Sequence, residues 1–301
     1  MDKTTKNYIK IALAGCLWGT LGYFGTRLKE HGLSAEMIAF ARLFSGLLIL
    51  TVFFAIKNPQ VLKIDKKGLI SCAVLGITSQ GIFNLAYFTS MRIVGAFTSA
   101  VLLYTSIIFM FFLGTFLYKE KPTRKKIIAV CICMAGCVLG ATGGDFSTLD
   151  TTIFGVLAGL LAAFTYALMP VLSKSASRDY NPFTVIIYSF LFGMLFLMPF
   201  AKPWVWLQQG LKASSFGMIF LFGFFASCIP YGLYIPSLHN VQISKVGVIS
   251  SVELIVSIII SGFVLKENVG LGHVAGAALI VSSIVYMNTN FEGPKKASKK
   301  S

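Results

Sequence analysis

Ten apolar runs, each long enough to cross a bilayer, make up most of this chain. A hydrocarbon core about 30 Å thick needs about 20 apolar residues in helical form, and a helix satisfies its own backbone polar groups. We therefore predict an all-α membrane protein with ten transmembrane helices. The runs cover about residues 8–27, 36–56, 68–90, 95–118, 124–142, 152–174, 182–201, 214–236, 245–265 and 270–290.

Charge and cysteine usage agree with a membrane protein. Only 12% of the 301 residues are charged, too few to cover a soluble protein of this size. The net charge of +15 does not indicate a nucleic-acid partner, because the basic residues gather in short breaks between apolar runs. Cys131, Cys133 and Cys137 share one run without a histidine or an acid, so we expect buried thiols, no metal site and no disulfide.

The distribution of basic residues predicts an orientation. With the N-terminus inside, the inner segments carry nineteen Lys and Arg residues and the outer segments carry six. Cytoplasmic loops are enriched in Lys and Arg, so both termini should lie in the cytoplasm and the chain should span the cytoplasmic (inner) membrane many times. The polar, Lys-rich segment 291–301 is expected to be a disordered cytoplasmic tail.

An internal repeat divides the chain into two parts. Leu117-Tyr118-Lys119-Glu120 recurs as Val264-Leu265-Lys266-Glu267, 147 residues later, and the same offset aligns Ser106 with Glu253. Residues 1–146 and 147–290 should therefore form two domains of five spans each. Because five is odd, the second half must enter the membrane upside down, which predicts inverted repeats with a substrate site between them near the midplane.

The chain resembles the EamA-type branch of the drug/metabolite transporter superfamily across residues 8–290. The resemblance rests on the order and duplication of several short motifs: Trp18-Gly19, Ala39-Phe40-Ala41-Arg42 and the two Lys-Glu helix ends. That family often has Glu-Pro in the fourth helix of the second half, whereas this chain has Glu253-Leu254, which puts the bend of that helix in doubt. The resemblance implies a secondary transporter for amino acids, amines or other small metabolites, and an EamA-like fold in each half.

Glu253 is the only carboxylate inside any predicted span. An ionisable group near the midplane is costly and marks a functional site by default. Ser250, Glu253, Ser257 and Ser261 form one polar stripe on this helix. Glu253 could bind a cationic substrate, carry a coupling proton, or merely hydrogen-bond a neighbouring helix. A carboxyl group away from water favours its neutral form, which suits a proton carrier.

Further polar and aromatic side chains on apolar spans are candidates for substrate binding. Each has a structural alternative, such as hydrogen bonding between helices, aromatic packing or, for Arg42, snorkelling to the interface. Aromatic rings at matched positions could also hold an organic cation. The predicted substrate-binding residues are Trp18, Gln80, Asn84, Tyr104, Tyr166, Tyr231, Tyr234 and Glu253, with Arg42 as a charge partner or substrate contact.

These residues predict a secondary active transporter that moves a small metabolite by alternating access. A proton-coupled exporter acting through Glu253 is one form of this prediction. A carrier of anionic metabolites or nucleotide sugars is the alternative within transporters, and a non-transporting receptor or embedded enzyme is the alternative outside them. No nucleotide-binding loop or catalytic cluster is apparent, so we expect no enzymatic activity and no cofactor. The expected partners are the lipid bilayer and a small-molecule substrate, and both a monomer and a homodimer remain open.

Overall fold

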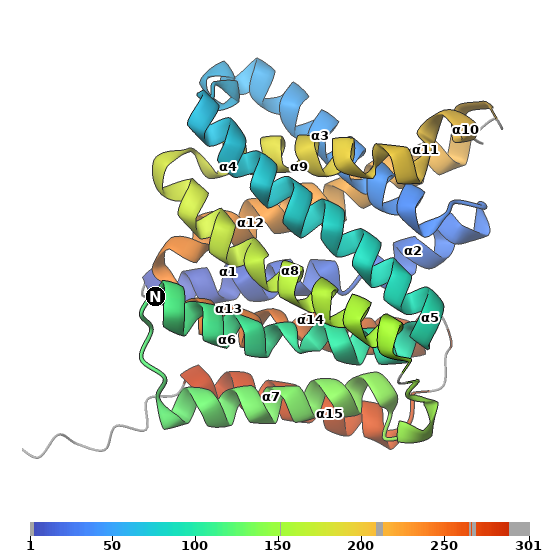
Figure 1. Cartoon of the computed structure of the whole chain (residues 1–301), viewed down its shortest axis with the longest axis vertical. Coiled ribbons are helices and arrows are strands. Elements are labelled where there is room, and N and C mark those ends of the chain that lie inside the picture. The colour runs from blue at the N-terminus through green and yellow to red at the C-terminus, as the bar shows by residue number, and fades with distance from the viewer. Residues whose placement is uncertain (1–2, 151, 209–212, 265, 267–268, 289–301) are drawn as a thin grey trace, which may run out of the picture.

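The computed structural model describes residues 3–150, 152–208, 213–264, 266 and 269–288 (Figure 1). These residues form helices and connecting turns, without a strand in the described ranges. The α-helices are α1 (Lys3–Trp18), α2 (Leu21–Glu30), α3 (Ala35–Lys57), α4 (Lys66–Gly76), α5 (Phe83–Tyr104), α6 (Ser106–Leu117), α7 (Arg124–Thr142), α8 (Ile153–Asp179), α9 (Pro182–Ala201), α10 (Pro203–Gln208), α11 (Ala213–Gly223), α12 (Ile229–Ser237), α13 (Ile243–Ser250), α14 (Val252–Phe263) and α15 (Leu271–Asn288). Five shorter helical segments complete the fold: η1 (Pro59–Leu62), η2 (Ile77–Ile82), η3 (Phe146–Thr148), η4 (Phe224–Cys228) and η5 (Leu238–Asn240).

Nine helical segments of the described chain are long and apolar enough to cross a membrane. The first predicted span, about residues 8–27, is not among these nine, because it is broken at Gly19 and Thr20 into the shorter helices α1 and α2. The third and fourth spans, Lys66–Ala96 and Thr98–Leu117, are separated by a kink at Gly95, whose φ of 78° is a left-handed conformation that glycine adopts without strain. The prediction of an all-α membrane protein is thus confirmed, and the nine spans of the described chain come close to the predicted ten.

Helix irregularities recur in the two halves at the offset of the sequence repeat. The π-helical turn η2 begins at Ile77, and its counterpart η4 begins at Phe224. Lys119 and Lys266 both have positive φ, at 52° and 56°. The fourth span of each half is also interrupted, between α5 and α6 in the first and between α13 and α14 in the second. The two halves therefore share local backbone distortions as well as residues.

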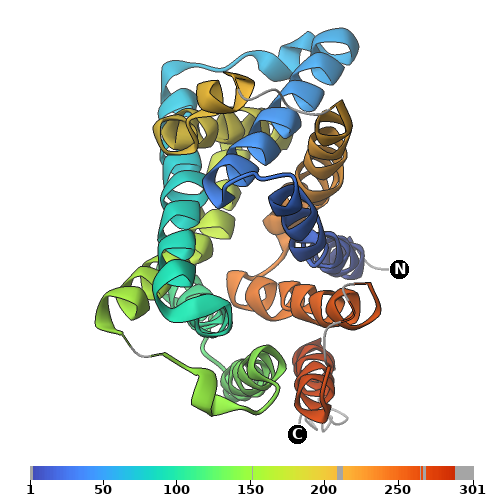
Figure 2. The ribbon, with the colours of Figure 1, turned by 90° about the vertical axis from the view of Figure 1, so that its right-hand side faces the viewer.

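The halves pack against each other in matched pairs. α3 lies on α9, α6 on α13, and α7 on α15, while the third span of each half contacts the first span of the other through α5–α8 and α1–α12. The α7–α15 pair lies along one edge of the molecule and α3 with α9 toward the opposite edge (Figures 1 and 2). This exchange of partners places α1, α8, α12 and the α13–α14 break in the middle of the bundle.

Candidate functional site

Glu253 lies in the first turn of α14, directly after the break at Ser251. Its side chain is half-buried and faces a cavity of about 10 Å³ that Tyr104, Tyr166 and Ser250 also line. The Tyr166 hydroxyl donates a long hydrogen bond of 3.5 Å to Glu253 Oε2. A space of this size holds about one water molecule, so the carboxylate is nearly enclosed in this conformation.

Arg42 and Tyr166 interact with Glu253, but among the described residues no salt bridge includes this carboxylate. Arg42 on α3 is buried and interacts electrostatically with Glu253. None of the salt bridges within the described ranges involves either residue. Within the described ranges, no salt bridge therefore neutralises Glu253.

A cluster of aromatic rings forms next to this carboxylate, and we call Trp18, Tyr231 and Tyr234 the aromatic cluster. The Trp18 ring meets Tyr231 edge-on at a centroid distance of 5.3 Å and Tyr234 at 5.0 Å. All three side chains are buried. A Cβ on Gly19, the residue after Trp18, would lie 2.7 Å from the Glu253 carbonyl oxygen, so the aromatic cluster and the Glu253 cavity are neighbouring parts of one region.

Gln80 connects the third span to the aromatic cluster. The π-helical turn η2 carries Gln80, whose Nε2 donates a 2.6 Å hydrogen bond to the Tyr231 hydroxyl. The other polar atom of its side-chain amide, Oε1, is buried without a hydrogen-bond partner in the described part of the chain. Asn84 Nδ2 donates to the Gln80 carbonyl at 2.5 Å within the same span. Such π turns interrupt regular helical hydrogen bonding and often occur at functional sites.

The structure thus brings the eight predicted binding residues to the middle of the bundle. Trp18, Gln80, Asn84, Tyr231 and Tyr234 are buried, and Tyr104, Tyr166 and Glu253 are half-buried. Of the eight, Tyr104, Tyr166 and Glu253 line the small cavity. Their role in substrate binding stays a prediction.

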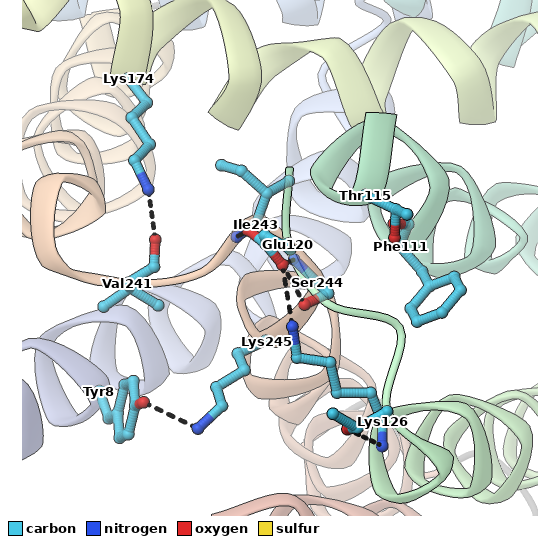
Figure 3. A network of polar contacts seen from close by, with 11 residues as sticks. Tyr8, Phe111, Thr115, Glu120, Lys126, Lys174, Val241, Ile243, Ser244 and Lys245 are labelled. Atoms are coloured by element: carbon cyan, nitrogen blue, oxygen red, sulfur yellow. Dashed lines mark hydrogen bonds and ion pairs between the residues drawn. The ribbon is translucent and has the colours of Figure 1, made fainter. Parts of the chain in front are cut away.

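A second polar cluster, at the end of the bundle where α1 begins, was interpreted in the sequence only as a helix end. We call Glu120, Lys126, Ile243 and Ser244 the Glu120 cluster (Figure 3). Glu120 accepts hydrogen bonds from the Ile243 amide at 2.5 Å, the Ser244 amide at 3.3 Å and the Ser244 hydroxyl. Lys126 Nζ lies 3.3 Å from Glu120 Oε2, and both side chains are more than 90% buried.

The Glu120 cluster joins the two halves of the protein. A carboxylate at the end of the fourth span holds the first amides of α13, where helix N–H groups lack partners within the helix. Gly114 permits this approach, because a Cβ there would come within 3.0 Å of the Glu120 carboxyl carbon. Two contacts at the same end add to it: Lys174 Nζ to the Val241 carbonyl at 2.6 Å, and Lys245 Nζ to the Tyr8 hydroxyl at 3.1 Å.

Comparisons with known proteins identify the family. The model of the EamA-like transporter family matches residues 5–142 and 153–289. The inner membrane transporter YicL of Salmonella typhimurium, which its name describes as uncharacterized, is 21% identical over 96% of this chain and 97% of its own length. The uncharacterized transporter YetK of Bacillus subtilis is 23% identical over 92% of this chain and 85% of its own.

A solved structure supports the fold. One crystal structure matches with a TM-score of 0.77 and 16% identity, over 94% of this chain and 96% of the other. At that identity the likeness concerns the fold alone. The relatives are transporters rather than enzymes, and the chain described here is a multi-pass membrane transporter. The chain belongs to the EamA-like transporter family.

Proposed function

We propose that this protein is a proton-coupled antiporter that exports a small cationic metabolite, such as an amine, and that proton and substrate compete for Glu253. The observation that carries the proposal is the enclosed Glu253 carboxylate, which lies between the halves without a salt bridge among the described residues. A carboxyl group in this setting binds a proton when the site is empty and releases it when a cation arrives. That competition at one site is sufficient for exchange of the two across a membrane.

The surroundings of Glu253 favour a substrate that carries N–H donors. Gln80 Oε1, next to the aromatic cluster, is a buried acceptor without a partner among the residues that the structure describes. An unsatisfied buried acceptor is costly unless a ligand pairs with it. The faces of the Trp18, Tyr231 and Tyr234 rings are electron-rich and attract cations. An ammonium group would satisfy the carboxylate, the amide oxygen and the rings together.

An anionic substrate is the second candidate, and Arg42 is the observation that favours it. Its side chain is buried on α3 instead of extending to the interface. Arg42 is nevertheless a single positive charge, and Glu253 would repel an anion that lies close to it. A cationic substrate avoids this repulsion.

Alternating access would require the two halves to separate in turn at each end of the bundle. In the present conformation the Glu120 cluster ties α13 to the fourth and fifth spans, and the Lys174 and Lys245 contacts lie beside it. We infer that this end is closed here and that it opens when these contacts break. The excess of basic residues in the inner segments supports an orientation in which this end faces the cytoplasm, with both termini there and the protein in the inner membrane.

The test is amine flux in proteoliposomes under an imposed pH gradient. We expect radiolabelled amine to move against its gradient when protons flow the other way. Glu253→Gln should lose this pumping. The amide keeps the shape of the side chain but does not ionise, so it can neither take up and release a proton nor pair with a cation. Control vesicles with Glu30→Gln, which changes an exposed acid on α2, should pump as the unmodified protein does. Pumping that survives in Glu253→Gln would show that the acid is structural and would refute the proposal.

A further inference from the structure

A second, larger pocket lies between α1–α2, η4 and α14, toward the end of the bundle opposite the Glu120 cluster. Its volume is about 350 Å³, and its lining includes Leu17, Phe24, Phe225, Ile260 and Val264. Thr20 and Tyr23 also line it, and the Thr20 hydroxyl is occupied by a 2.6 Å hydrogen bond to the Leu17 carbonyl. Apart from the Tyr23 phenol, the pocket therefore offers a ligand mainly apolar contacts.

This pocket continues the face of α14 that carries Glu253. Ile260 and Val264 follow Glu253 by seven and eleven residues, which returns each to nearly the same side of the helix. Seven residues correspond to about 10 Å along the axis. Between acid and pocket, the Ser257 hydroxyl donates a 3.1 Å hydrogen bond to the Gly19 carbonyl at the break between α1 and α2.

The two spaces differ in size and in chemistry. The cavity at Glu253 measures about 10 Å³, whereas small-molecule pockets usually measure about 300–1,000 Å³. The apolar pocket, at about 350 Å³, lies within that range. A substrate that used both would place a small charged head at the carboxylate and a much larger apolar body about two to three helical turns away.

We propose that the substrate is an amphiphilic amine, whose ammonium group pairs with Glu253 and whose apolar body occupies the pocket at Ile260 and Val264. This inference rests on the proposed function and narrows its substrate class. The contact between Ser257 and Gly19 must open for one molecule to reach both places. The break in the first span supplies the flexibility, since Gly19 and Thr20 lie outside the regular helices on either side.

The chemistry of the pocket favours an amphiphilic amine over two other classes of substrate. Apolar walls cannot compensate the hydration lost by a sugar or a nucleotide, because a buried polar group without a hydrogen bond is costly. A compact amine would leave the pocket unused and gain no binding energy from it. An aryl or alkyl body gains about 25 cal/mol for each Å² of apolar surface removed from water.

The test compares three probes: 4-phenylbutylammonium, butylammonium, and the neutral 4-phenylbutanol, which controls for partitioning into detergent. Calorimetry on the purified protein should show that 4-phenylbutylammonium binds at least about tenfold more tightly than butylammonium, because the phenyl ring buries at least about 60 Å². Ile260→Trp fills the pocket and should remove the higher affinity for 4-phenylbutylammonium without weakening the binding of butylammonium. Ile259→Trp, at an exposed position on the same helix outside the pocket, should retain that higher affinity.

The outcomes separate the inference from the function on which it rests. Equal affinity for the two amines, with proton release on binding, would refute the amphiphilic substrate and leave the antiporter intact. If Ile260→Trp still binds 4-phenylbutylammonium more tightly than butylammonium, the apolar body binds elsewhere, which would also refute the inference. Failure of both amines to bind would refute the proposed function and the inference with it. If Ile260→Trp does not fold, Ile260→Ser replaces it in the test. This variant must lower the affinity for 4-phenylbutylammonium without changing that for butylammonium.

Discussion

Glu120→Ala should open the end of the bundle that the Glu120 cluster closes. The substitution removes the acceptor of three hydrogen bonds from Ile243 and Ser244 and leaves the Lys126 ammonium buried without its partner. Breaking a buried ion pair in this way costs about 3–5 kcal/mol. If the cost falls on the closed conformation alone, the ratio of open to closed protein rises by about two to three and a half powers of ten, since 1.4 kcal/mol corresponds to a factor of ten.

Thiol labelling can measure this shift. Ser173 on α8 is fully buried beside Lys174, and its hydroxyl has no hydrogen-bond partner within the described ranges, so Ser173→Cys is a mild change. In a background without the six native cysteines, this reporter should react slowly with a water-soluble maleimide and much faster when Glu120→Ala is added. Glu30→Gln, which breaks an exposed ion pair with Arg27, should leave the rate unchanged.

The second substitution at the cluster distinguishes charge from packing. Lys126→Met added to Glu120→Ala removes the unpaired ammonium and should restore part of the protection, because replacing both partners of a buried pair is far less costly than removing one. A labelling rate that does not change in Glu120→Ala, in protein that remains folded, would refute the idea that this cluster holds the end closed.

Two further predictions concern packing and orientation. A Cβ at Gly276 would lie 2.2 Å from the backbone nitrogen of Gly140, so Gly276→Ala should separate α15 from α7. We expect thermal-shift measurements to show a free energy of unfolding lowered by about 1–3 kcal/mol. The control Gly22→Ala, whose added Cβ would meet open space, should be nearly neutral. Cysteines at Ser147 and Lys299 should be labelled from opposite sides of the membrane, and labelling from one side would contradict the proposed orientation.

The spans were predictable from the sequence because hydrophobic length and turn chemistry are local properties. The predicted runs 124–142 and 182–201 coincide with α7 and α9. For α9 the boundary follows from Asn181, whose Oδ1 accepts a 2.9 Å hydrogen bond from the Phe183 amide, and from Pro182 in the first turn. Glu253 could be singled out because a carboxylate within an apolar span is conspicuous in sequence alone.

Features that depend on tertiary contacts were not predictable. The break at Gly19 reflects the close approach of α14, because a Cβ there would lie 2.6 Å from Val256. The Glu120 cluster was missed because Lys-Glu at the end of a span resembles an ordinary helix terminus, and its burial depends on Ser244, more than a hundred residues away. Only the match with Glu267 in the repeat signalled that the position carries more than a boundary.

Proton release on substrate binding tests the central claim most directly. Titrating 4-phenylbutylammonium into the purified protein in two buffers of different ionisation enthalpy gives the number of protons released from the difference between the apparent binding enthalpies. Because Glu253 is proposed to exchange one proton for one cation, we expect release of about one proton at pH values where the empty site is protonated, and none in Glu253→Gln. Tight binding without proton release in the unmodified protein would contradict the account.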